Sequence, residues 1–281
     1  MICRLTNVRG DRFYRGGAES MINFFYTKNR GIRMKKIVFM LCMSLAVTMC
    51  ASPCKAKQEK VTYKYKASNK TLTISGKYLK GKLPEGMMGA YDETIRYDYK
   101  WSSLSGKVKK VVLKKGVERI GHNAFGDFRK LKSVKFPKTL RRIDAYAFSA
   151  AQISNLQLPD NVTVIGKAAF YPSVTSGTIK KVKLPAKLKT IGKSAFEDQK
   201  FTELTIPSNV EKIGSYAFSG CQSLNKIVIK SKKLKKIGPL AFGDSAHNAV
   251  FYVPKEKEEE YREMLLGRVV STSYTPQIIA Q

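Results

Sequence analysis

Residues 204–218 read LTIPSNVEKIGSYAF, and the same arrangement of apolar residues recurs before and after this stretch. Its last six residues form the fragment I-G-x-x-A-F, which occurs five times, and a sixth copy has aspartate in place of the glycine. The copies begin at Ile120, Ile143, Ile165, Ile191, Ile213 and Ile237. The phenylalanines that end successive copies are 23, 22, 26, 22 and 24 residues apart. A nearly constant period of this length predicts a solenoid in which each repeat forms one coil.

A second element with strict alternation precedes each of these fragments, and in the quoted stretch it is Leu204–Pro207. Alternation with period two predicts a strand with one buried face, and proline ends the strand because it cannot donate to the ladder. The apolar pair that follows, here Val210 and Ile213, is predicted to point inward, and the glycine after it to permit a tight turn. Alanine and phenylalanine should then enter the core, with the phenylalanines of neighbouring coils stacked in one column.

These residues resemble the BspA-like subclass of bacterial leucine-rich repeats, whose coils carry the pattern L-x-x-I-x-[IL]-P-x-x-[VL]-x-x-I-G-x-x-A-F. Residues 131–143 and 224–229 fit it, whereas Asp144 replaces the glycine, and Lys114 and Lys230 replace the proline. The resemblance implies a predominantly β leucine-rich-repeat solenoid of about six coils of roughly 23 residues, with an N-terminal β-cap and a C-terminal capping helix. It also implies a bacterial surface or secreted protein of the adhesin type, without identifying its partner.

The sequence predicts five segments. Met34 is a better start than Met1, so the part before it is expected to be a mis-started or disordered extension. A basic Met34-Lys35-Lys36 and an apolar run from Ile37 to Ala51, short for a membrane span, indicate a signal peptide, and no transmembrane span is expected after its removal. The segments are the extension 1–33, the signal peptide 34–56, the N-terminal β-cap 57–108, the repeats 109–254 and the C-terminal cap 255–281.

Two details of this division carry their own expectations. Cys50 leaves lipid anchoring open as an alternative to release, although Met49 fits poorly beside a lipidated cysteine. The insertion from Tyr171 to Lys180 lengthens one coil and is expected to bulge from the surface.

The composition favours binding over chemistry. The formal net charge of +31 favours acidic partners, and the export signal makes nucleic acid an improbable one. Cys221 is the one cysteine in the repeats, so no disulfide framework is available, and its alignment with Phe128 predicts a buried filler. His122 and His247 are predicted to be surface or turn residues. Because no catalytic arrangement, metal-ligand spacing or phosphate loop is recognisable, we expect no enzyme, cofactor or metal.

The strand residues that point away from the core should form one surface, with neighbouring coils about 4.8 Å apart. The candidate ligand-binding residues on it are Lys110, Lys135, Gln157, Lys181, Lys183, Thr205, Lys226 and Tyr252. The surface carries five lysines and a single acid, Glu203, so it should be electropositive. One interpretation is an exported non-enzymatic protein that binds a protein partner or a host matrix or cell-surface component. The alternative is an accessory protein that binds acidic polysaccharide. A solvated strand face also carries lysine, so a purely structural interpretation stands beside both.

Overall fold

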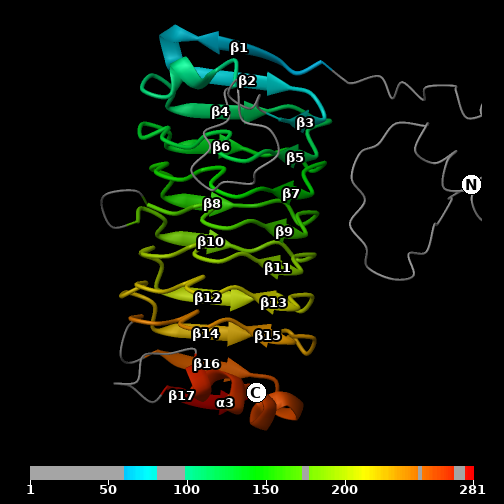
Figure 1. Cartoon of the computed structure of the whole chain (residues 1–281), viewed down its shortest axis with the longest axis vertical. Coiled ribbons are helices and arrows are strands. Elements are labelled where there is room, and N and C mark those ends of the chain that lie inside the picture. The colour runs from blue at the N-terminus through cyan, green and yellow to red at the C-terminus, as the bar shows by residue number, and fades with distance from the viewer. Residues whose placement is uncertain (1–59, 81–98, 173–176, 246–248, 269–275) are drawn as a thin grey trace, which may run out of the picture. The chain divides into compact units, whose positions relative to one another are not determined.

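The computed structural model describes residues 60–80, 99–172, 177–245, 249–268 and 276–281. The chain divides into two compact units, 1–58 and 59–281, and every described residue belongs to the second. In this second unit the chain winds into coils that stack on one another (Figure 1). The predicted extension, the signal peptide, Cys50 and His247 lie outside the described residues.

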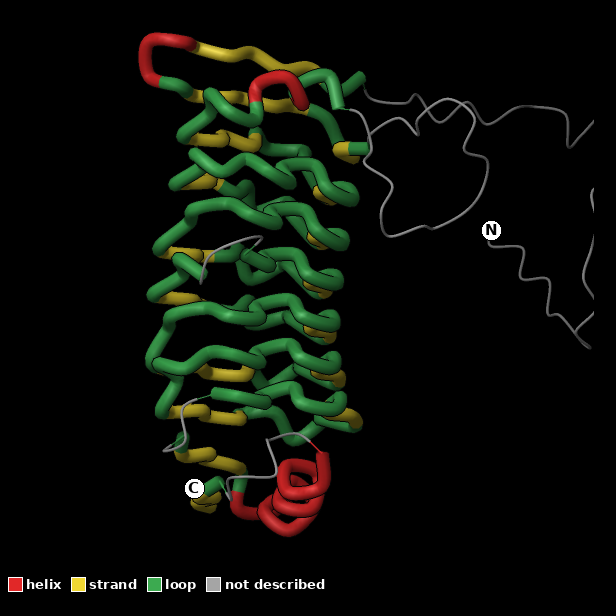
Figure 2. The backbone as a smooth tube through the Cα atoms, turned by 60° about the vertical axis from the view of Figure 1, so that its left-hand side comes forward, coloured by secondary structure: helices red, strands yellow, loops and turns green. Residues whose placement is uncertain are grey.

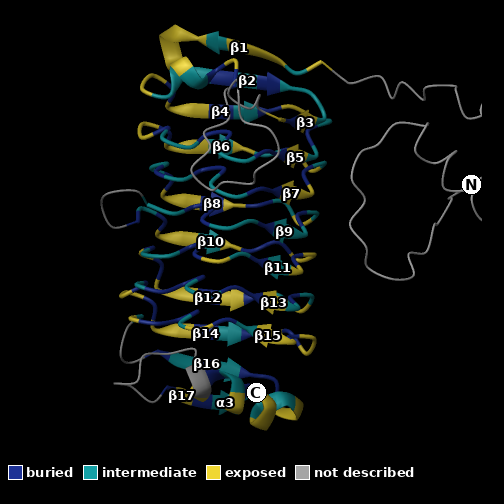
Figure 3. Cartoon of the chain, viewed as in Figure 1, coloured by how far each residue is buried: buried dark blue, intermediate teal, exposed yellow. Residues whose placement is uncertain are grey.

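Each coil contributes a long strand to one side of the stack, as the yellow segments of Figure 2 show. These strands are β2 (Thr71–Ser75), β4 (Lys110–Leu113), β6 (Ser133–Lys135), β8 (Asn155–Gln157), β10 (Lys181–Lys183), β12 (Glu203–Ile206), β14 (Lys226–Ile229) and β16 (Val250–Val253). Burial alternates along them, so that Leu204 and Ile206 are buried while Thr205 is exposed (Figure 3). The prediction of period-two strands is therefore confirmed.

The long strands form three sheets and not one. Their orders are β1-β2-β4-β6, β8-β10 and β12-β14-β16-β17. The two interruptions lie before β8 and before β12. The connector between the motif phenylalanine and the next long strand is shortest there, since the central residue of the strand comes only eight residues after the phenylalanine (Phe148 to Leu156 and Phe196 to Leu204). In the other described repeats this distance is nine residues or more. The strand ladder is therefore lost where the connector is shortest.

A second sheet, of short strands, follows the corner at which the proline usually lies. Its strands are β3 (Tyr78–Leu79), β5 (Arg119–Ile120), β7 (Arg142–Ile143), β9 (Val164–Ile165), β11 (Thr190–Ile191), β13 (Lys212–Ile213) and β15 (Lys236–Ile237). They pair in chain order without interruption, and the second residue of a strand faces the core, as fully buried Ile143 and Ile213 show. The inward direction of these isoleucines was predicted, but the sheet that they belong to was not.

The turn after each short strand carries a third set of hydrogen bonds between coils. The backbone N–H of Asn123 donates to the carbonyl of Ala145 at 3.0 Å, and that of Phe125 donates to the carbonyl of Ala147 at 2.8 Å. Equivalent bonds recur up to Phe218, whose N–H donates to the carbonyl of Ala241 at 2.8 Å. The backbone groups of the turn are thus paired even though the turn is neither helix nor strand.

The motif glycine serves a different purpose from the predicted one. The left-handed residue of the turn is the second residue after the glycine, for example Ser194 (φ 54°) and Tyr216 (φ 58°), so the glycine does not make the turn tight. A Cβ atom on Gly192 would lie 2.4 Å from the carbonyl carbon of Gly166 in the preceding coil. Glycine is therefore needed because the backbones of neighbouring coils approach closely at this point.

The core contains the predicted column of stacked rings. The centroids of successive phenylalanines from Phe125 to Phe242 are 5.2–5.6 Å apart, and the ring planes are nearly parallel. Trp101 extends the column at its N-terminal end, 5.9 Å from Phe125. Because a single coil cannot enclose its own phenylalanine, the column ties the stability of each coil to that of its neighbours.

The N-terminal end of the stack is closed by a hairpin. Strand β1 (Thr62–Lys66) runs antiparallel to β2, and the 3₁₀ turn η1 (Ala67–Asn69) joins them. Beneath the hairpin, Trp101 donates from Nε1 to the carbonyl of Ala124 at 2.8 Å, just before the 3₁₀ turn η2 (Ser102–Leu104). The hairpin thus supplies β structure at the end of the stack where the β-cap was expected.

The C-terminal end carries the predicted capping helix. It consists of the 3₁₀ turn η3 (Lys255–Lys257) and helix α3 (Glu258–Arg268). Tyr261 anchors the helix, since its buried hydroxyl donates to the carbonyl of Ser231 at 2.8 Å. Strand β17 (Gln277–Ala280), which was not predicted, pairs in parallel with β16 and adds one more rung to the long-strand side.

The predicted surface bulge lies partly outside the described residues, which omit 173–176 of the insertion. At the base of the insertion the side chain of Gln199 is buried and joins two backbone groups of the lengthened coil. Its Nε2 donates to the carbonyl of Phe170 at 2.8 Å, and its Oε1 accepts from the N–H of Ile179 at 3.0 Å. The extra residues are thereby accommodated without leaving these buried groups unpaired.

Candidate binding surface on the long strands

The predicted binding residues lie on the outward side of the long strands. Seven of them are exposed, and Tyr252 is half-buried. The parallel register places Lys181 opposite Asn155 and Lys183 opposite Gln157, so equivalent residues form rows across the coils. We call the two outward rows the strand face. Its first row is Thr71, Lys110, Ser133, Asn155, Lys181, Glu203, Lys226 and Val250, and its second row is Thr73, Val112, Lys135, Gln157, Lys183, Thr205, Val228 and Tyr252.

The strand face was expected to be one continuous surface, but three separate sheets carry it. Lys110 and Lys135 lie in the first sheet, Lys181 and Lys183 in the second, and Lys226 in the third. Within each sheet the spacing is fixed by main-chain hydrogen bonds, whereas the shortened connectors set it between sheets. The lysines are therefore brought together in groups.

The lysines of the strand face are available to a partner. None of Lys110, Lys135, Lys181, Lys183 and Lys226 forms an ion pair with an acid in the described part of the chain. Lys226 has one specific neighbour, since its Nζ lies 5.9 Å from the centroid of the Tyr252 ring. These five lysines thus form no described ion pair, and the one acid of the strand face, Glu203, is the register partner of Lys226.

Two basic residues of this surface were not among the predicted ones. Lys66 pairs with Thr71 and Lys64 pairs with Thr73, so β1 adds a lysine to each row beyond β2. Tyrosine and lysine alternate at Tyr63–Lys66, which is the pattern of a strand. It did not indicate which face the lysines would share, because that depends on the antiparallel register.

The opposite end of the strand face is apolar. The second row ends with Val228 and Tyr252, and β17 adds Ile279 opposite Tyr252. All three side chains are half-buried. The strand face therefore changes from basic near β1 to apolar and aromatic near β17.

The described residues contain no set of three or more His, Cys, Asp and Glu side chains arranged to hold a metal ion. Cys221 is fully buried, as predicted, and burial raises the pKa of its thiol far above the usual range. Its Sγ donates to the carbonyl of Phe196 at 3.3 Å. The thiol is therefore a core group and not an available nucleophile. None of the described helices is both long enough and apolar enough to cross a membrane.

A stack of parallel coils with a column of phenylalanines and an exposed strand face defines a β-solenoid repeat protein. The family model described as the BspA type leucine rich repeat region matches residues 96–198 and 174–260, with six copies. These ranges cover more than half of the sequence, and the chain belongs to this family.

Several solved structures are similar. A leucine rich cell surface protein from Faecalibacterium prausnitzii is 18% identical, with 83% of this chain and 77% of that chain covered and a TM-score of 0.42. A leucine-rich repeat protein from Bacteroides ovatus is 16% identical, with 79% and 78% covered and a TM-score of 0.28. The leucine-rich repeat protein of T. pallidum is 17% identical, with 78% and 98% covered and a TM-score of 0.34. No curated protein matches the sequence.

Proposed function

We propose that this chain is an exported, non-enzymatic repeat protein that binds a protein partner at the bacterial cell surface through its strand face. The observation that carries the proposal is the set of exposed lysines without described ion-pair partners on the outward side of the long strands, in three groups whose positions are fixed by the main chain within each sheet. Because the backbone fixes the Cα positions within each sheet, binding needs no rearrangement of the main chain, and the lysine side chains are the groups that lose freedom.

The two ends of the strand face suggest the chemistry of the partner. The basic part, from Lys64 to Lys183, suits acidic side chains, which would also speed the encounter. The apolar end around Tyr252 suits a hydrophobic or aromatic side chain, and tyrosine is common among residues that dominate interface energies. A protein surface offers both kinds of group, whereas a uniform polyanion offers one.

Export is the second part of the proposal, and it rests on the signal peptide that the sequence predicts at 34–56. Cell-surface localisation, with release or lipid anchoring at Cys50, is part of the same proposal. Mass spectrometry of the chain isolated from culture medium and from membranes would identify its N-terminus and any lipid. Recovery of the chain with residues 34–56 intact in the cytoplasm alone would contradict it.

Acidic glycan is a second candidate ligand, and the excess of lysine over acid on the strand face favours it. A polyanion that neutralises several lysines releases bound counterions, so its affinity should fall steeply as salt rises. Binding to a protein that also uses the Tyr252 end should keep a salt-resistant part.

The test uses the full-length chain as bait against extracellular matrix proteins and an array of acidic glycans, at low and at high salt. We expect the double variant Lys135→Glu/Lys183→Glu to lose about tenfold or more in affinity, because both changes put a negative charge on the strand face. The matched control is Lys130→Glu/Lys200→Glu, which makes the same charge change at two exposed lysines of the connectors. Equal losses in the two variants would refute the strand face as the binding surface.

A further inference from the structure

The short-strand sheet carries a pair of arginines that the proposed function does not use. Arg119 in β5 and Arg142 in β7 are register partners on adjacent parallel strands. Both side chains are about half exposed and point outward, while the neighbouring Ile120 and Ile143 are buried. Strands in register are about 4.8 Å apart, so two like charges are placed close together here.

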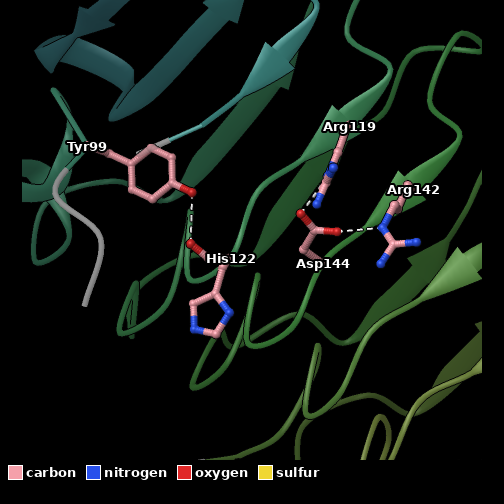
Figure 4. A network of polar contacts seen from close by, with 5 residues as sticks. All are labelled: Tyr99, Arg119, His122, Arg142 and Asp144. Atoms are coloured by element: carbon pink, nitrogen blue, oxygen red, sulfur yellow. Dashed lines mark hydrogen bonds and ion pairs between the residues drawn. The ribbon is translucent and has the colours of Figure 1, made fainter. Parts of the chain in front are cut away.

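A single carboxylate holds the two arginines. Asp144 accepts a hydrogen bond from Nε of Arg119 at its Oδ2 and another from Nε of Arg142 at its Oδ1, both at 2.7 Å (Figure 4). The side chain of Asp144 is 10% exposed and lies between the two arginines, bonded to both. In the six copies of the motif, Asp144 is the one residue that replaces the glycine. The acid therefore occurs only in the coil that contains Arg142, the second arginine of the pair.

Asp144 leaves most of the hydrogen-bonding capacity of the pair unused. A guanidinium group has five N–H donors, and each arginine gives only its Nε–H to the carboxylate. Among the described contacts, the terminal N–H groups of both arginines form no hydrogen bond to Asp144 and remain available as donors. One negative charge against two positive charges leaves a net charge of +1. The carboxylate also fixes both guanidinium planes, so less side-chain entropy remains to be lost on binding.

We propose that Arg119 and Arg142 form a binding site for one tetrahedral oxyanion, the sulfate or phosphate group of an ester or the free ion. Asp144 acts as a positioning residue. A single arginine can satisfy a carboxylate with its two terminal donors. A sulfate or phosphate group has three or more oxygens to share between two guanidinium groups, which matches the pair better than a carboxylate does. Lys212 and Lys236, farther along the same sheet, each offer a point charge and no fork.

The test measures binding of inorganic sulfate, inorganic phosphate and dextran sulfate to the full-length chain by calorimetry. We expect Arg142→Lys, which keeps the charge and loses the fork, to bind about tenfold more weakly, the factor that one charge-assisted hydrogen bond supplies. Arg142→Gln should lose at least as much. Lys236→Gln removes the same charge from the register partner of Lys212 on the same sheet, where neither side chain is a guanidinium group, and should change the affinity less than twofold. Circular dichroism of each variant checks that the coils are intact.

The outcomes divide cleanly. Weakened binding of the free ions by Arg142→Lys supports a site for the free oxyanion, and weakened binding of dextran sulfate alone supports a site for an ester on a polymer. Unchanged binding by Arg142→Lys, or an equal loss in Lys236→Gln, would show that general positive charge suffices and would overturn the proposal. Absence of binding by all three probes would overturn it too. The strand face can bind dextran sulfate as well, so that probe is measured in the Lys135→Glu/Lys183→Glu background. The pair lies outside the strand face, so the results with the free ions do not depend on the proposed function.

Discussion

Truncation of one ring in the middle of the phenylalanine column should weaken the whole stack. Phe196 is fully buried, and its ring lies 5.2 Å from that of Phe170 and 5.6 Å from that of Phe218. Phe196→Ala removes the buried ring and leaves a cavity, at a cost of about 4 kcal/mol. The two ring pairs account for about 1 kcal/mol each of that cost. Since a folded domain is typically stable by only about 5–15 kcal/mol, this single change should remove a large share of the stability.

The assay is equilibrium unfolding in urea, followed by far-ultraviolet circular dichroism and by the fluorescence of Trp101, the single tryptophan of the chain. Trp101 stacks at the N-terminal end of the column, so its fluorescence reports whether that end unfolds together with the rest. The control is Phe136→Ala, which removes a half-buried ring that touches the column edge-on at Phe148. We expect it to cost less, about 2–3 kcal/mol, because part of the ring stays exposed and it touches one ring of the column and not two. If the two variants were equally destabilised, the stacked column would not be the feature that holds the coils together.

Three further outcomes are expected. Gly192→Ala should destabilise the chain by about 2–3 kcal/mol, because the added methyl group meets the backbone of the preceding coil. The control Gly106→Ala has open space around it and should be neutral or slightly stabilising. The midpoints of urea unfolding of the two variants test this difference. Cys221 should remain unmodified by iodoacetamide at pH 8 in the folded chain and react once urea unfolds it, which peptide mapping by mass spectrometry would reveal, and rapid native labelling would contradict its burial. Burial raises the pKa of Tyr261 in the folded state. Its stabilising contribution is therefore complete below the ordinary tyrosine pKa of about 10 and declines as the pH rises above that value. Tyr261→Phe should make the free energy of unfolding in urea fall less steeply between pH 8 and 11, and an unchanged pH profile would count against the assignment.

The sequence was sufficient to predict the coil, because the coil is built from local patterns. Alternation around Leu204 reveals a strand, and the spacing from Ile213 to Phe218 places the ring in the core. The column of rings follows from the period alone, because identical coils that stack place identical residues above one another. The outward direction of Lys135 and Lys183 follows in the same way, from alternation and not from any contact.

What the sequence did not reveal depends on contacts between coils. The role of Gly192 is set by the backbone of a neighbouring coil, so a single repeat cannot distinguish close approach from a tight turn. The short strands have two residues each, too few for any periodicity. The interruptions before β8 and β12 come with a connector that is one residue shorter. This difference is visible in the spacing of the sequence, but nothing in the sequence indicates that the strand ladder would be lost there. The joint role of Arg119 and Arg142 requires Asp144 between them, and the sequence shows only a departure from the repeat.

The interruptions of the long-strand ladder bear on how the solenoid would respond to tension. The strands run across the stack, so the hydrogen bonds between coils point along its length, and a pull on the two ends loads the coil junctions in series. Each junction between coils then bears the whole force, and the junction with the fewest interactions opens first. The junctions between β6 and β8 and between β10 and β12 lack long-strand ladder bonds. On this side they keep one backbone connector bond each, from Gln152 N–H to the Leu131 carbonyl and from Lys200 N–H to the Ile179 carbonyl, beside the short strands, the turns and the rings. A pull applied to the two ends of the solenoid should therefore open it at these two places, leaving the hairpin end and the helix end folded on either side.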